Sequence, residues 1–263
     1  MVPDAFLVRL AASFAAGFSI VALVTALADL SGEGPAGFIG GLPSTGAVAL
    51  LAIGLTQSTS AAVEATTLFP LGFSVAFAFL LFYTAPVQMR FWPRMCLALA
   101  LWAVSALAAA LWRPDDFAVS LAGSTLVSAA VFFARRKITT GTAGHSDVKP
   151  GWARIVLRGS LGGSVVSGVV LVSAVGGPLV GGLFAAAPAI WSSSLYVTAQ
   201  THGIEFSRSI TRTFMRTGIM TTIPYAVAVR YLFPVSGVWL GTALGYVAIS
   251  PLAYLAWNLA KAN

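Results

Sequence analysis

The feature that most constrains the fold is the recurrence of long apolar runs along the whole chain. Each run is long enough to cross a bilayer as a helix, which takes about 20 mainly apolar residues. Of the 263 residues, 58% are hydrophobic and only 9% are charged, whereas soluble domains carry about 25% charged residues. The sequence therefore predicts an all-α integral membrane protein that crosses the bilayer many times.

Turn residues between the runs predict nine transmembrane helices. The expected spans are 6–28, 37–56, 61–84, 94–112, 117–134, 155–174, 177–199, 209–233 and 236–258. The first run is too long for the apolar core of a signal peptide, and Asp4 precedes it, so we do not expect a cleavable signal. The expected organisation is a first membrane repeat (1–112), a connecting helix with a polar linker (113–153) and a second, inverted repeat (154–263).

The basic residues predict the orientation of these spans. With nine spans, alternate connections face opposite sides, and one side collects only Arg9, Arg113 and Arg230. The other side collects Arg90, Arg94, Arg135, Arg136, Lys137, Lys149, Arg154, Arg158, Arg208, Arg212, Arg216 and Lys261. Because Lys and Arg concentrate in cytoplasmic loops, the second side is expected to be cytoplasmic. This predicts a plasma (inner) membrane protein of prokaryotic type, with its N-terminus outside and its C-terminus inside.

Composition and motifs exclude several function classes. The net charge of +7 comes from Lys and Arg in short connections, which is typical of membrane orientation and not of nucleic-acid binding. Cys96 is the single cysteine, so no intramolecular disulfide is expected. The sequence has no P-loop, GxSxG or HExxH motif. We therefore expect neither an enzyme nor a bound cofactor or metal.

Two similar segments indicate an internal repeat. Gly40 and Gly41 precede Leu42, and Glu64 follows 23 residues after Gly41. In the second half, Gly181, Gly182 and Leu183 are followed by Glu205, again 23 residues after the second glycine. Each segment also contains a proline near its start, although not at matching offsets, and a glutamine near its end; these residues are Pro43, Pro188, Gln57 and Gln200. Because an odd number of spans separates the copies, the repeat is expected to be inverted.

The glycines and prolines permit two interpretations. Small residues let membrane helices pack closely, and proline is tolerated in a first turn. Alternatively, the helices are broken, and their free backbone groups line a cavity between two inverted repeats. Four hydroxyl residues follow the prolines, and each either binds its own helix carbonyls or provides a ligand for a polar solute or a cation; they are Ser44, Thr45, Ser192 and Ser193.

The charged residues near these segments also leave alternatives open. Glu64 and Glu205 are each expected in the first turn of a following span, where a carboxylate stabilises the helix end or takes part in ion coupling. Arg208, Arg212 and Arg216 are spaced by four residues, which predicts one face of a helix. That face is expected to bind anionic lipid or to admit an anionic substrate.

The segment "GGLFAAAPAIWSSSLYVTAQTHGIEFSRSIT" (181–211) and "TTIPYAVAVRYLF" (221–233) resemble the GlpM family of small inner-membrane proteins. The resemblance covers about residues 154–261 and rests on a Gly–Pro-headed helix, a Gly-Ile-Glu bend and an Ile-Pro-Tyr helix. The first half keeps Gly-Gly-Leu and Glu64 but lacks Ile-Pro-Tyr. The resemblance implies a fold more than an activity.

These features together predict a small secondary transporter or permease that moves a small solute or an ion by alternating access. Its expected partners are that substrate, a coupling ion and anionic lipids, and a homo-oligomer is compatible with the sequence. The expected substrate or ion site consists of the glycines, prolines, hydroxyl residues, glutamines and glutamates named above. The alternatives are a structural or assembly subunit of a membrane complex and a lipid translocase.

Overall fold

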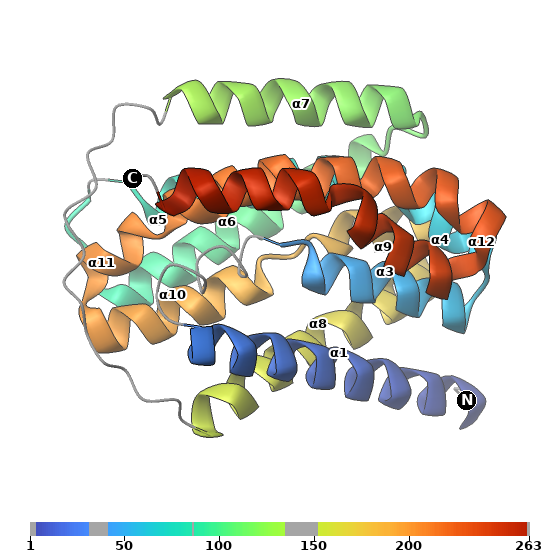
Figure 1. The fold of residues 1–263 in the computed structure, drawn as a ribbon, viewed down its shortest axis with the longest axis horizontal. Coiled ribbons are helices and arrows are strands. Elements are labelled where there is room, and N and C mark those ends of the chain that lie inside the picture. Colours follow the sequence, from blue (N-terminus) through green and yellow to red (C-terminus); the bar gives the residue numbers. More distant parts are fainter. Residues whose placement is uncertain (1–3, 32–41, 86, 135–151, 262–263) are drawn as a thin grey trace.

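The computed structural model describes residues 4–31, 42–85, 87–134 and 152–261, and within these ranges the regular secondary structure is entirely helical (Figure 1). The elements are α1 (Asp4–Ser31), α3 (Ser44–Thr56), α4 (Thr59–Ala65), α5 (Phe69–Tyr83), α6 (Phe91–Trp112), α7 (Phe117–Ala134), α8 (Trp152–Gly176), α9 (Pro178–Ala185), α10 (Ala189–His202), α11 (Ile204–Ser209) and α12 (Thr211–Lys261). Gly40 and Gly41 lie outside the described residues. The predicted all-α class is confirmed.

Several helices are long and apolar enough to cross a membrane. The described residues contain five such helices, or six if the bent pair α4–α5 is counted as one span, and α3 and α7 are shorter apolar helices. Their outer faces are exposed and apolar, as at Leu111 (79% exposed) and Val235 (87% exposed). Exposed apolar surface on this scale is typical of proteins embedded in lipid, which agrees with the predicted membrane protein.

Two predicted spans are interrupted in the structure, and a third is described only in part. The span expected over 61–84 is two helices, α4 and α5, bent by 47°. The span expected over 177–199 is divided into α9 and α10, because the chain leaves helical geometry before Pro188. The span expected over 37–56 is described only from residue 42, and its helix α3 begins at Ser44.

The longest helix, α12, is a hairpin with two arms. Gly237 has a φ of 72° and a ψ of 171°, and it breaks the helix. Contacts then pair residues from the two arms in antiparallel order: the rings of Tyr225 and Tyr246 are 5.2 Å apart, and Arg216 donates to the carbonyl of Leu259 at 2.8 Å. The division predicted between 233 and 236 lies close to this break.

The helices α1 and α8 pack closely along their lengths and run in opposite directions (Figure 1). A Cβ added to Gly17 would overlap the side chain of Val166, and a Cβ added to Gly162 would overlap Val21. Since Gly17 precedes Val21 while Gly162 precedes Val166, these two contacts require an antiparallel crossing. Glycine at both contacts allows the backbones to approach closely.

The core lies between the crossed helices and joins both halves of the chain. Leu50 and Ile53 of α3 are fully buried and belong to one cluster with Val166 of α8 and Tyr225 of α12. A second cluster contains Phe77, Trp191 and Phe214, and the ring of Trp191 is stacked with both phenylalanine rings. The two halves therefore form one packed body.

Candidate functional site

A pocket of about 50 Å³ lies where α3 and α10 begin. Its wall includes Leu42, Pro43, Thr45 and Gly46, the segment 185–188 and the first turn of α10, and Phe69, Phe73 and Thr222 complete it. From this point α3 and α10 extend in opposite directions through the bundle (Figure 1). The pocket therefore lies where the starts of α3 and α10 meet.

The two helix starts have the same backbone geometry. Pro43 has φ −74° and ψ 38°, and Pro188 has φ −78° and ψ 43°. In each, the N–H after the proline donates to the carbonyl before it, at 2.8 Å from Ser44 and at 2.8 Å from Ala189. Among the described residues, no side chain caps either helix. The two prolines predicted as site residues therefore have nearly the same backbone conformation, and both line the pocket.

Thr45 is the one predicted hydroxyl residue that lines the pocket. It is 5% exposed, and its Oγ1 has no hydrogen-bond partner among the described residues. Ser44 is also buried without such a partner, but it is not part of the pocket wall. A buried hydroxyl without a partner is unusual and costs free energy, so Thr45 is the strongest candidate ligand in the predicted set.

The predicted serines and glycines of the second half have structural roles instead. Ser192 Oγ donates to the carbonyls of Pro188 and Ala189, and Ser193 Oγ donates to that of Ile190. Gly181 and Gly182 are buried in α9, where a Cβ would overlap Ser173 or the backbone of Ala65. None of the four lines the pocket, and the glycines allow α9 to pack closely.

The predicted glutamines and glutamates also lie away from the pocket. Gln57 is exposed at the end of α3 and donates to Ser173 Oγ at 2.9 Å, and Gln200 is exposed on α10. Glu205 lies in the first turn of α11, as expected. The same expectation for Glu64 is wrong, because this exposed residue lies in the last turn of α4.

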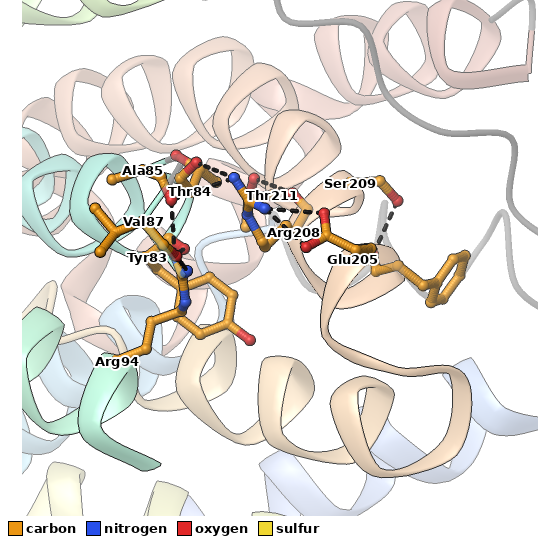
Figure 2. Close-up of polar contacts among 10 residues, drawn as sticks. Tyr83, Thr84, Ala85, Val87, Arg94, Glu205, Arg208, Ser209 and Thr211 are labelled. Atoms are coloured by element: carbon orange, nitrogen blue, oxygen red, sulfur yellow. Dashed lines mark hydrogen bonds and ion pairs between the residues drawn. The ribbon is translucent and has the colours of Figure 1, made fainter. Parts of the chain in front are cut away.

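Arginines bind backbone carbonyls where α5 ends (Figure 2). Arg94 is 2% exposed, donates to the carbonyls of Tyr83 and Ala85 at 2.7 and 2.9 Å, and also donates to that of Val87. Arg208 donates to the carbonyl of Thr84 at 2.8 Å and forms an ion pair with Glu205. Because the last carbonyls of a helix lack intrahelical donors, these guanidinium groups complete the hydrogen bonding of this end.

The three predicted arginines are divided between two helices. Arg208 lies on α11, whereas Arg212 and Arg216 lie on α12, and the single residue between these helices, Ile210, keeps helical torsions. Arg208 is bound between Glu205 and α5, and Arg216 is bound to the carbonyl of Leu259 at the end of the second α12 arm. Arg208 and Arg216 thus contact other parts of the protein, and binding of anionic lipid or substrate by the three arginines stays a prediction.

A second group of arginines lies at the opposite end of the bundle. Arg230 donates to the hydroxyls of Thr66 and Thr67 at 3.1 and 3.0 Å, and its guanidinium lies 4.4 Å from the ring centre of Phe117. Arg9 donates to the carbonyl of Thr56 at 2.6 Å, where α3 ends. The α4 end and the α11 end are opposite ends of the bundle in Figure 1. Arg94 and Arg208 are thus separated in space from Arg9 and Arg230, which the sequence assigned to the other side.

Sequence reasoning missed most of the pocket wall. Phe69, Phe73, Ile190, Trp191 and Thr222 line it, yet each lies in an apolar run whose composition is that of any membrane helix. Ile190 and Trp191 are distinguished in the sequence only by their position two and three residues after Pro188. The wall contains no charged residue among the described residues.

Comparisons with known proteins identify no family for this chain. No family model matches the chain, and neither the curated proteins nor the solved structures contain a match. The resemblance to the GlpM family stays a prediction.

Proposed function

We propose that the protein is a small secondary transporter in which two inverted repeats alternately expose the pocket between α3 and α10. The observation that carries this proposal is the meeting of two equivalent helix starts, each at a proline, at one pocket. In inverted-repeat transporters, substrate sites lie between the repeats and are formed by discontinuous helices.

A constant offset of 145 residues relates the two halves (188 minus 43 for the prolines). At this offset α1 corresponds to α8, α3 to α10, α4 to α11, and α5 and α6 to the two arms of α12. Fully buried Phe69 corresponds to Phe214, and Thr66 and Thr211 each donate to a carbonyl three residues earlier at 2.6 Å. The register differs by four residues from that of the Gly-Gly pairs, so the prolines correspond and the glycine pairs do not.

The direction of the helices supports inversion. Gly17 corresponds to Gly162 and Val21 to Val166, and each glycine packs on the valine of the other helix. Reciprocal contacts of this kind are expected around a two-fold axis. Because the corresponding helices α1 and α8 are antiparallel, they would cross a membrane in opposite directions.

The arginines support nine spans and the proposed orientation. The nine spans would be α1, the span ending in α3, α4–α5, α6, α7, α8, α9–α10, α11 with the first arm of α12, and its second arm. Arg94, Arg208 and Arg216 would then lie at the cytoplasmic end, and Arg9 and Arg230 at the outer end, in agreement with the positive-inside rule. The N-terminus would be outside and the C-terminus inside.

A structural subunit of a membrane complex is the second candidate. It is favoured by the burial of Ser44 and Ser193, which are 6% and 3% exposed, and by the tight packing of Gly182. A transporter in an occluded conformation has the same burial but opens during its cycle. Water access to the pocket therefore separates the two functions.

The test is cysteine accessibility in the Cys96→Ser background. Single cysteines at Thr45 and Ile190, which line the pocket from corresponding positions, are treated with a membrane-impermeant thiol reagent from either side of oriented vesicles. Transport predicts labelling at both positions from both sides. A cysteine at Ser193, buried outside the pocket wall, is the matched control and should stay unlabelled. No labelling at Thr45 and Ile190 in a folded protein would favour the structural subunit.

A further inference from the structure

We infer that the pocket between α3 and α10 binds a small monovalent anion. This inference rests on the proposed transport function and names its substrate class. The pocket has a volume of about 50 Å³, which is enough for a few water molecules or one small ion. Its wall carries no charged residue among the described residues, so the polarity of the backbone decides which charge it favours.

Two helix N-termini face the pocket. The first N–H groups of a helix have no intrahelical acceptor, and the N-terminus carries a partial charge of about +0.5. Among the described residues, no hydrogen bond engages the N–H of Gly46 or that of Ile190, and both residues line the pocket. Helices α3 and α10 contain 13 and 14 residues, and Gly46 and Ile190 lie in their first turns.

One opposing element also reaches the pocket. Helix α9 ends at Ala185, and its C-terminus carries a partial charge of about −0.5. Two positive ends and one negative end leave about half of a positive elementary charge. Several nearby carbonyls already accept hydrogen bonds, since Leu42, Phe184 and Ala187 accept from Ser44, Ala187 and Ala189. The carbonyls of Ala185 and Ala186 accept no hydrogen bond among the described residues, so the wall has free acceptors as well as free donors. The net positive charge of the helix ends suits a monovalent anion.

The hydroxyl of Thr45 is a separate observation that points to a ligand. It is buried in the wall of the pocket and has no partner among the described residues. A hydroxyl can donate one hydrogen bond, and a bound anion would accept it. A cation would use the oxygen of this hydroxyl as a ligand but would face two positive helix ends. The helix ends therefore disfavour the cation that the hydroxyl residues alone had left open.

The test measures the thermal unfolding midpoint of the purified protein in detergent, with sodium constant and the anion varied. Gluconate, too large for the pocket, is replaced stepwise by chloride or nitrate. Binding to the folded state predicts a saturable rise of several degrees, because a ligand that binds only the native state stabilises it. Exchanging sodium for potassium at constant chloride should leave the unfolding midpoint unchanged. No rise with either anion, or a rise that follows the cation, would overturn the inference.

Variants of two threonines on α3 separate pocket binding from a general salt effect. Thr45→Val removes the pocket hydroxyl and should abolish the rise, whereas Thr45→Ser should retain it. Thr56→Val is the matched control, since the hydroxyl of Thr56 donates to Ala52 at 2.6 Å and lies outside the pocket wall. An equal rise in Thr45→Val and in the wild type would contradict the inference. If Thr45→Val does not fold, Ile190→Thr, which adds a hydroxyl at the corresponding position, should lower the chloride concentration at half-effect; an unchanged concentration would count against the site.

Together with a flux measurement, the unfolding experiment distinguishes failure of the anion site from failure of transport. If chloride or nitrate raises the unfolding midpoint but no anion flux is measured in proteoliposomes, the anion site is supported and the transport function is rejected. If cysteines at Thr45 and Ile190 are labelled from both sides but no anion raises the unfolding midpoint, the transport function is supported and the anion site is rejected.

Discussion

The two halves of the chain share a backbone plan but differ in the side chains that they place at the pocket. Both begin a helix at a proline with nearly the same torsions. After Pro43 the wall contains Thr45 and Gly46, whereas after Pro188 it contains Ile190 and Trp191. The first half thus provides a hydroxyl and a glycine against which the ring of Phe69 packs, and the second half provides two large apolar side chains. Similar helix starts can therefore carry different side chains at one pocket.

The arginines differ between the halves in a complementary way. Arg208 of α11 donates to the carbonyl of Ala85, and Arg230 of α12 donates to the carbonyl of Val63. Residue 208 corresponds to 63, and residue 230 to 85, at the offset of 145. An arginine on one helix thus donates to a backbone carbonyl of another part of the chain at each end of the bundle, and we call this contact an arginine bridge. Its donor lies on the short helix α11 at one end and on the long helix α12 at the other.

The largest expected effect concerns two corresponding core phenylalanines. Phe69→Ala and Phe214→Ala should each lower the free energy of unfolding by about 3 kcal/mol, because both side chains are fully buried. Phe133→Ala, at an exposed position of α7, is the control and should have little effect. Thermal or denaturant unfolding in detergent measures the loss. A large effect at only one of the two buried positions would break the proposed equivalence.

The reciprocal glycine contacts between α1 and α8 predict a smaller pair of effects. Gly17→Ala and Gly162→Ala should each cost about 1–3 kcal/mol, since the added methyl overlaps a valine of the facing helix. Gly168→Ala, also on α8, meets nothing within 4 Å. That control should be neutral or slightly stabilising, because alanine is favoured over glycine in a helix by about 0.5–1 kcal/mol. The opposite order of unfolding midpoints would contradict the packing of these helices.

The two arginine bridges predict increased access to the pocket from opposite sides of the membrane. Arg208→Gln should increase labelling of a cysteine at Thr45 from the cytoplasmic side, because it releases α11 from the end of α5. Arg230→Gln should increase labelling from the outer side, because it releases α12 from α4. We expect changes of about tenfold or more, since each hydrogen bond to a charged group contributes about 1.5–3 kcal/mol and about 1.4 kcal/mol is a factor of ten. Equal changes from both sides would show that the bridges do not control access.

The sequence predicted the unbroken helices well and the broken ones poorly. The helices α1, α6, α7 and α8 lie close to their predicted spans, because long apolar runs between polar turns define them. The break within 177–199 was expected only as one of two interpretations, since "LFAAAPAI" remains apolar through the break and only Pro188 interrupts it. A hydropathy pattern indicates which segments can cross a membrane, but it does not indicate where a helix begins within such a segment.

The candidate site was predicted only in part for a related reason. Pro43, Thr45 and Pro188 line the pocket as expected. The Gly-Gly pairs suggested a register that differs by four residues from that of the structure, because glycine pairs are frequent in packed membrane helices. The residues that fix the structural register, such as Phe69 with Phe214 and Thr66 with Thr211, are ordinary constituents of apolar helices. Their equivalence becomes visible only through their burial and hydrogen bonds.

The most direct test of the account is the sidedness of two corresponding exposed residues, Ser60 on α4 and Glu205 on α11. In the Cys96→Ser background, single cysteines at these positions are labelled with an impermeant reagent in intact and in inverted vesicles. An inverted repeat predicts that Ser60→Cys reacts from the outside and Glu205→Cys from the cytoplasm. Labelling of both from the same side would contradict the inversion and, with it, alternating access between the two halves.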